Sequence, residues 1–341
     1  MKIPLRIRLV KLCVLACLLV IGPAHGAEKS VVIKLATLAP EGSSWMKSFH
    51  ALNKEVMEKT NNQVQFKVYG GGVLGDEVDM LRKMKIGQIQ AAVLSSGSLA
   101  LLYKEFDVLQ IPFLFQKYEE VDFILKKMDS FFRKGLEENG YMLLGWSEGG
   151  FVYLMSTGPP IASVADIKKA KVWTWGGSPM AKAIFDEAKV TAIPLSIPDV
   201  LVGLQTGLVD VVYAPPAVAI SLQWFTKVKY LTDVPLNYVT GAVVMNRDFF
   251  KRLPPNVQNI ILESSRRLLD QSKVVTRNEN QDAIKVMTKQ GVKIVTPAKE
   301  NVDELKRLSN EAMRRLGGQT FSTKTHDEVV AQVENYRKGA K

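Results

Sequence analysis

Residues 145–149 (Gly-Trp-Ser-Glu-Gly) are the first place where this sequence could carry chemistry. They match G-x-S-x-G, the turn that exposes the nucleophilic serine of many hydrolases. Such a turn must enter a helix, whereas residues 151–155 have the apolar pattern of another strand. A serine triad also needs a histidine, and neither His50 nor His326 lies in a recognisable catalytic context. We therefore expect a strand-to-strand crossover here, with an exported hydrolase using Ser147 as a remote alternative.

Residues 70–75 (Gly-Gly-Gly-Val-Leu-Gly) form a second candidate, because they match G-x-G-x-x-G between a predicted strand and a predicted helix. That context suits a dinucleotide-binding turn. The acidic residue expected about 20 residues further on is missing, since the next strand ends in Ser95-Ser96. The motif instead predicts a tight turn at the lip of a cleft, and no cofactor is expected.

Residues 1–26 resemble a leader, and their removal changes the composition of the remaining chain. Basic residues precede an apolar run at 12–22, which is well short of the ~20 residues that span a bilayer, and Ala24-His25-Gly26 follows as a small-x-small signal. This pattern predicts a signal peptide cleaved near Gly26 and a periplasmic protein. Both cysteines, Cys13 and Cys17, would leave with it, so no thiolate or cysteine-based metal site is expected.

The remaining charge argues against nucleic acid as a partner. Removing a leader with four basic and no acidic residues lowers the formal charge from +11 to +7. No block of basic residues interleaved with aromatic residues remains. Three histidines in the whole chain make a histidine-rich metal site implausible, and no metal is expected.

Elements that could position a site follow from hydrophobic periodicity. Strands are predicted at 31–36, 64–69 and 88–94, separated by helices that begin near Ser43 and Asp76. A second series of strands and helices follows. This order predicts mostly parallel sheets in two α/β lobes, with a ligand cleft between them. The second series comprises strands at 141–144, 151–155, 171–175, 192–195, 209–213 and 238–245, and helices at 178–188, 198–207 and 257–290.

Four short stretches, taken in order, resemble one known family. They are residues 72–77 (Gly-Val-Leu-Gly-Asp-Glu), 111–115 (Ile-Pro-Phe-Leu-Phe), 204–210 (Leu-Gln-Thr-Gly-Leu-Val-Asp) and 252–255 (Arg-Leu-Pro-Pro). Each is weak alone, but together they are specific. From about Val31 to about Arg337 the chain is similar to the extracytoplasmic substrate-binding proteins of TRAP transporters, of the DctP type.

The resemblance implies an α/β, two-lobed periplasmic binding protein fold with a ligand cleft between the lobes and a helical C-terminal region. It places residues 27–150 plus about 240–278 in lobe I, and residues 151–239 plus about 279–341 in lobe II. It implies a receptor rather than an enzyme, one that closes on a small-molecule ligand and docks on TRAP membrane subunits. Some relatives with unusual clefts work beside a helical-repeat periplasmic protein, and an interaction protein or ligand carrier of that kind is the alternative.

The chain departs from the family where the ligand's carboxylate is usually bound. The family's arginine in a Lys-Ile-Arg strand corresponds to Trp173, its arginine after the first crossover to Val152, and its later asparagine to Ala214. An arginine fork gives two charge-assisted hydrogen bonds, whereas an enclosed carboxylate without a partner loses several kcal/mol of hydration. The substitutions therefore predict a hydrophobic or aromatic ligand rather than a small dicarboxylate.

The residues predicted to bind this ligand are Trp173, Val152, Ala214, Tyr213, Phe151, Trp175 and Tyr69. Packing in a lobe core is the alternative role for Trp175 and Phe151. A cation elsewhere could still bind a carboxylate, and Arg82, Lys171 and Lys182 are the candidates.

Overall fold

The structure is a computed structural model, and it describes residues 30–316 and 318–339 of the chain. The predicted signal peptide therefore lies outside the described residues. Within these ranges, no helix combines the length and apolarity needed to cross a bilayer.

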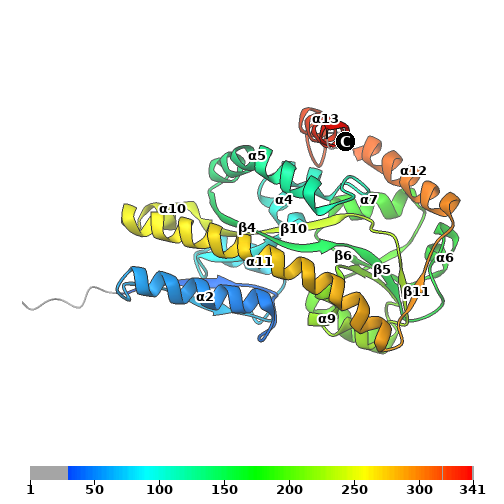
Figure 1. Ribbon diagram of the computed structural model, residues 1–341, viewed down its shortest axis with the longest axis horizontal. Coiled ribbons are helices and arrows are strands. Elements are labelled where there is room, and N and C mark those ends of the chain that lie inside the picture. The colour runs from blue at the N-terminus through cyan, green and yellow to red at the C-terminus, as the bar shows by residue number, and fades with distance from the viewer. Residues whose placement is uncertain (1–29, 317, 340–341) are drawn as a thin grey trace, which may run out of the picture.

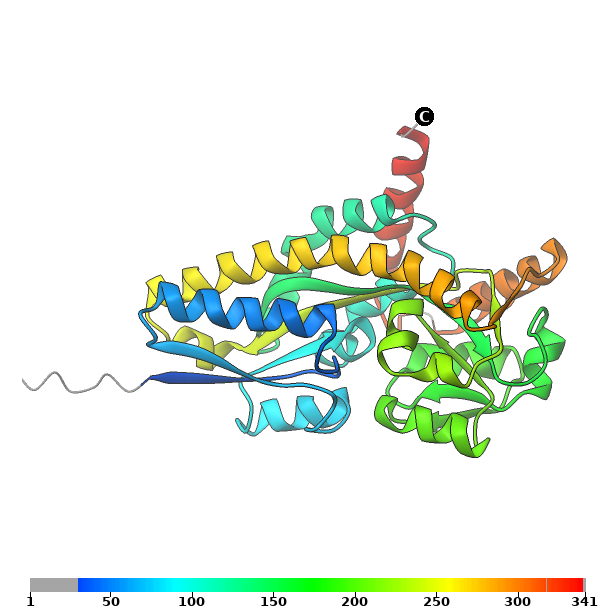
Figure 2. The same cartoon turned by 60° about the horizontal axis from the view of Figure 1, so that its bottom comes forward.

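Two mixed β-sheets form the centres of two lobes that lie side by side (Figures 1 and 2). The first lobe is built on a five-stranded sheet of order β2-β1-β3-β10-β4 and the second on a six-stranded sheet of order β11-β9-β5-β8-β6-β7. The first sheet contains β1 (Val31–Ala36), β2 (Val64–Tyr69), β3 (Ala91–Ser95), β4 (Tyr141–Phe151) and β10 (Tyr238–Asn246). The second contains β5 (Tyr153–Ser156), β6 (Val172–Trp175), β7 (Ala192–Leu195), β8 (Val211–Ala214), β9 (Tyr230–Thr232) and β11 (Lys293–Val295).

Helices cover both faces of the first sheet because its strands are apolar on both sides. Neighbouring residues in a strand point to opposite faces, so Leu144 packs with α2 and α11, whereas Leu143 packs with α5. The helices are α2 (Ser44–Lys59), α3 (Glu77–Lys85), α4 (Ser96–Leu102), α5 (Tyr118–Glu138), α6 (Val164–Lys169), α7 (Pro179–Glu187), α8 (Val200–Thr206), α9 (Pro216–Ser221), α10 (Arg247–Lys251), α11 (Pro255–Lys289), α12 (Lys299–Leu316) and α13 (Thr323–Gly339). Short 3-10 helices are η1 (Lys104–Gln110), η2 (Ile197–Asp199) and η3 (Trp224–Thr226).

The sequence predicts mostly parallel sheets, but both sheets also contain antiparallel strand pairs. β1 pairs in parallel with β2 and β3, but β10 is antiparallel to both β3 and β4. In the second sheet, β5 is antiparallel to β8 and β9. The cause is the chain crossing: β4 leaves the first lobe where β10 enters it, so the two strands must run in opposite directions.

Helix α11 is the third connection between the lobes, and it runs along both of them (Figure 2). Asn280 fixes it at the crossing: its Nδ2 donates to the Gly149 carbonyl oxygen at 2.7 Å, and its Oδ1 accepts from the Ala217 amide at 3.0 Å. Gly150 has φ +114°, and a Cβ there would lie 2.5 Å from Asn280 Nδ2. The crossing therefore needs glycine at this position.

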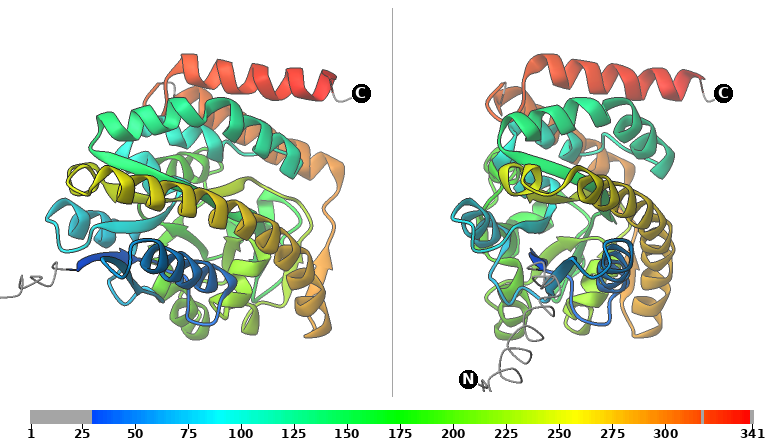
Figure 3. Two further views of the ribbon diagram at one scale, coloured as in Figure 1. Left: turned by 60° about the vertical axis from the view of Figure 1, so that its left-hand side comes forward. Right: turned by 90° about the vertical axis from the view of Figure 1, so that its left-hand side faces the viewer.

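The last two helices pack on different lobes. α12 lies against α6 and α7, whereas α13 lies against α5 and η1, on the side of the five-stranded sheet (Figure 3). The Phe123 and Tyr336 rings are 4.8 Å apart, and Arg337 Nε lies 2.8 Å from Glu120 Oε1. The sequence placed everything after about residue 279 in lobe II. The lobe boundaries stay a prediction, but α13 has its contacts on the first lobe.

Candidate ligand-binding site

A cavity of about 350 Å³ lies between the lobes, within the ~300–1,000 Å³ range of ligand pockets. The first lobe contributes the segment that follows β1 and residues from α2, β3 and β4, and the second contributes residues from β6, α7 and β8. Five of the seven residues predicted to bind the ligand line it: Val152, Trp173, Trp175, Tyr213 and Ala214.

Trp173 forms an aromatic wall within the second lobe. Its Nε1 donates to the Leu195 carbonyl oxygen at 3.1 Å, which satisfies the one polar atom of the indole. Its ring lies 4.9 Å from the Tyr213 ring and 5.4 Å from the Trp224 ring, measured between centroids. The Trp173 ring is thus held in place as an apolar surface of the cavity.

Trp175 lies on the same face of β6, two residues further on, but reaches across the cleft. Its Nε1 donates to Asp76 Oδ2 at 2.9 Å, and a Cβ on Gly97 would meet its ring at 2.9 Å. Asp76 also accepts from the Ile197 amide at 3.4 Å. Trp175 therefore both lines the cavity and joins the two lobes, so neither a purely core role nor a purely binding role describes it.

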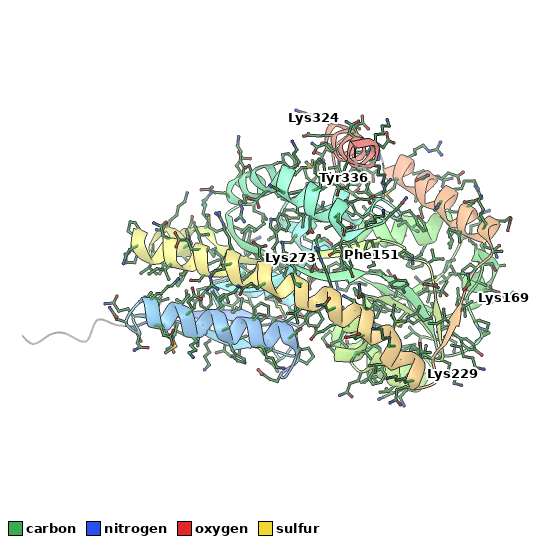
Figure 4. The ribbon with its side chains drawn as sticks, in the orientation of Figure 1. Phe151, Lys169, Lys229, Lys273, Lys324 and Tyr336 are labelled. Carbon is green, nitrogen blue, oxygen red and sulfur yellow. The ribbon has the colours of Figure 1, made fainter. Side chains whose placement is uncertain are left out.

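Phe151 and Tyr69 are outside the cavity lining. Phe151 lies where the chain crosses between the lobes (Figure 4), and its ring packs 5.1 Å from Tyr118 and 5.0 Å from Tyr238. This is the core role that the sequence left open for it. Tyr69 ends the edge strand β2, with Lys67 Nζ 5.4 Å from its ring. β2 lies two strands away from β3, which lines the cavity.

Two carboxyl groups are the charged side chains of the described cavity lining, and sequence reasoning missed both. Glu77, in the first turn of α3, lies against β3, where the Ser95 amide donates to it at 3.1 Å and the Ser95 hydroxyl at 2.6 Å. Burial raises the pKa of Glu77 to about 7, although the Ser95 hydrogen bonds oppose the shift. Glu77 is therefore substantially protonated near neutral pH.

Glu148 is the second carboxyl, and its side chain is fully buried. Arg277 Nε on α11 lies 2.8 Å from Glu148 Oε1, and the Tyr238 hydroxyl donates to Glu148 Oε2 at 2.6 Å. Arg277 also binds Asp122 at 2.6 Å, and the guanidinium holds the pKa of Asp122 below its ordinary value even though burial acts in the opposite direction. The Arg277 charge is thus taken up by two carboxylates beside the crossing.

The three cations proposed as alternative carboxylate ligands lie outside the lining. Arg82 pairs with Asp79 at 3.2 Å and Lys182 with Asp186 at 2.6 Å, while Lys171 Nζ donates to the Gly207 carbonyl oxygen at 3.0 Å. Within the described part of the chain, the lining contains no lysine or arginine.

The two glycine motifs have structural roles. Ser147 lies inside β4, opposite Gly241 of β10, so the chain does not turn into a helix there. The expected crossover at residues 145–149 is also wrong in position, because β4 runs on to Phe151 and the chain passes to the second sheet between Phe151 and Tyr153. His50 contacts Glu41 and His326 contacts Asp327, so neither forms a dyad with Ser147. Residues 70–75 form the predicted tight turn, in which a Cβ on Gly72 would lie 3.2 Å from Pro198 of the other lobe. Residues 30–316 and 318–339 contain no cluster of three or more potential metal-binding side chains.

Comparison with known proteins places this geometry in a family. Residues 35–319 match the DctP family, bacterial extracellular solute-binding proteins of family 7. The 2,3-diketo-L-gulonate-binding periplasmic protein YiaO of Escherichia coli is 26% identical over 245 residues, covering 72% of this chain and 74% of that protein. The C4-dicarboxylate-binding periplasmic protein DctP of Rhodobacter capsulatus is 23% identical over 283 residues, covering 82% and 81%.

Solved structures agree. A TRAP periplasmic solute-binding protein from Ochrobactrum anthropi superposes with a TM-score of 0.78 at 26% identity, covering 92% of this chain and 97% of that one. A sugar-acid-binding protein from Advenella mimigardefordensis, in complex with galactonate, has a TM-score of 0.84 at 20% identity and covers 90% and 99%. The chain belongs to the DctP family of TRAP-type extracytoplasmic solute-binding proteins. These proteins are periplasmic receptors, not enzymes, and the predicted fold and family are confirmed.

Proposed function

We propose that this protein delivers a largely hydrophobic or aromatic ligand to the membrane subunits of a TRAP-type transporter. The observation that carries the proposal is the cavity lining: Trp173, Trp175 and Tyr213 form an aromatic wall, and Glu77 and Glu148 are the charged side chains of its described part. Both carboxyl groups already accept hydrogen bonds from the protein. Enclosing an anionic ligand here would strip its hydration without supplying a cation.

A contact between the lobes links ligand binding to the arrangement of the two walls. Trp175 and Asp76 hold the two walls together, so a ligand that fills the cavity would favour this arrangement over an open one. Membrane subunits are the partners that family membership implies. A helical-repeat periplasmic partner stays a prediction from the sequence, as does export by cleavage near Gly26.

A ligand panel tests the proposal by thermal unfolding. Indole represents an uncharged aromatic ligand, and succinate and galactonate represent the acids. A ligand at 100 times its Kd stabilises the folded state by about 2.7 kcal/mol. We expect indole to raise the melting temperature and the acids to leave it unchanged. Stabilisation by an acid alone would contradict the proposed ligand class.

Replacing Trp173 links the result to this wall. Trp173→Arg puts a buried cation where the ring packs, and should weaken indole binding at least tenfold. Trp173→Phe keeps the wall apolar and is the matched control, with a smaller loss. An equal loss of indole affinity in the two variants would show that binding does not depend on the apolar character of this wall.

A further inference from the structure

The lining of the cavity includes core residues of both lobes. In the first lobe these are Trp45 and Phe49 on α2 and Val93 on β3. In the second lobe they pack together beneath α12. We call this second-lobe part the inner chamber; it is lined by Leu154, Val164, Ile167, Phe185, Ala188, Leu236, Leu305 and Ser309.

The inner chamber is the part of the cavity that adjoins a hydrophobic core of the second lobe. Leu154, Val164, Ile167 and Ala188 belong to one buried apolar cluster, and Leu305 of α12 packs against it. Protein interiors are normally packed to crystal-like density, and unfilled space is destabilising. Space that adjoins a binding cleft and is lined by aliphatic side chains therefore indicates that part of a ligand fills it.

Tyr213 connects the inner chamber with the aromatic wall of the cleft. Its ring lies 4.9 Å from the Trp173 ring and 6.2 Å from the Phe185 ring of the inner chamber, and all three residues line the cavity. Of the chamber residues, Ser309 on α12 has the one polar side chain. A compact molecule would occupy the cleft alone, whereas an elongated one would reach the inner chamber as well.

We propose that the ligand carries an unbranched aliphatic chain, whose tail passes Trp173 and Tyr213 and ends in the inner chamber beneath α7 and α12. This inference rests on the proposed function and specifies its ligand class. The chamber is apolar, so the tail contributes binding by leaving water, and any polar end of the ligand stays toward the cleft.

The experiment is calorimetric titration of the protein with the n-alkan-1-ols from hexanol to dodecanol. Burial of each added methylene should lower Kd about fourfold until the chamber is full, after which Kd levels off. Ala188→Leu fills part of the chamber and should move this plateau to a shorter alcohol, and Ser309→Leu on α12 should do the same. Ala165→Leu, at an exposed position of α6, is the matched control and should leave the plateau in place.

The possible outcomes separate the two proposals. A Kd that does not depend on chain length, or a plateau that neither chamber variant moves, overturns the aliphatic chain. If indole binds while the alcohols show no length dependence, the hydrophobic ligand class stands and the chain fails. If succinate or galactonate binds and no apolar probe does, both fail.

Discussion

The two walls of the cavity differ in the polar side chains that they contain. On the first-lobe wall the two carboxyl groups are occupied, Glu77 by Ser95 and Glu148 by Arg277 and Tyr238. The buried hydroxyls of Ser96 and Thr240, which also line the cavity, have no hydrogen-bond partner among the described residues. On the second-lobe wall, aromatic rings take the place of polar groups, and the indole nitrogen of Trp173 is satisfied by a backbone carbonyl. The difference teaches that a buried polar group does not make a site polar once the protein has satisfied it.

Replacement of Arg277, the cation paired with Glu148 of the first-lobe wall, should have the largest effect on the free energy of unfolding. Arg277→Met leaves the buried carboxylate of Glu148 without its cation, and should lower the free energy of unfolding by about 3–5 kcal/mol. Urea denaturation measures this loss. The double variant Arg277→Met/Glu148→Gln removes the uncompensated charge and should recover much of the stability. A loss under about 1 kcal/mol in the single variant would show that Glu148 does not depend on Arg277.

Glu77 predicts a pH dependence of the same wall. Its pKa is raised from 4.5 in the unfolded chain to about 7 when folded, so the native state binds the extra proton in between. Stability should therefore fall as the pH rises from about 4.5 to 7, by about 3 kcal/mol from this group, and then level off. Glu77→Gln should remove that part of the slope in urea titrations. Asp107, whose pKa burial also raises to about 7, keeps its own contribution in both proteins.

An unchanged pH slope in Glu77→Gln would contradict this account of Glu77. Asp107→Asn is the matched control, because Asp107 lies outside the cavity lining. It should reduce the slope by its own share and leave that of Glu77 intact.

Loss of the Trp175–Asp76 contact between the two walls should lower the free energy of unfolding by less than the changes at Arg277 or Glu77. Trp175→Phe removes the hydrogen bond to Asp76, and bonds to charged groups contribute about 1.5–3 kcal/mol. Because this bond joins the lobes, we expect its loss to weaken ligand binding about tenfold and to increase the radius of gyration in X-ray scattering. Trp173→Phe loses a bond within one lobe, so it should lower stability without changing the radius. An unchanged radius in Trp175→Phe would mean that this bond does not hold the walls together.

Local signals predicted most elements but could not position the site completely. Ser43 caps α2 and Gly207 ends α8 in a left-handed conformation, as their residue types favour. Strands β1 and β2 have the predicted limits, since alternation and flanking turns suffice to define them. Trp173 and Trp175 of β6 line the cavity, and their role in ligand binding stays a prediction.

The missed features depend on contacts between distant parts of the chain. Glu77 has the sequence context of a solvated helix start, and only the packing of α3 on β3 buries it. Glu148 and Arg277 are 129 residues apart and meet because α11 crosses both lobes. Phe151 turns from the cavity into the core because the aromatic rings of Tyr118 and Tyr238 lie beside the crossing.

Native mass spectrometry of the protein purified from its host tests the central claim most directly, when anything released on denaturation is then identified. We expect an uncharged or amphipathic ligand that is mostly apolar, with a lower retained fraction in Trp173→Arg. A small dicarboxylate or sugar acid bound at full occupancy would contradict it, because no lysine or arginine lines the described cavity.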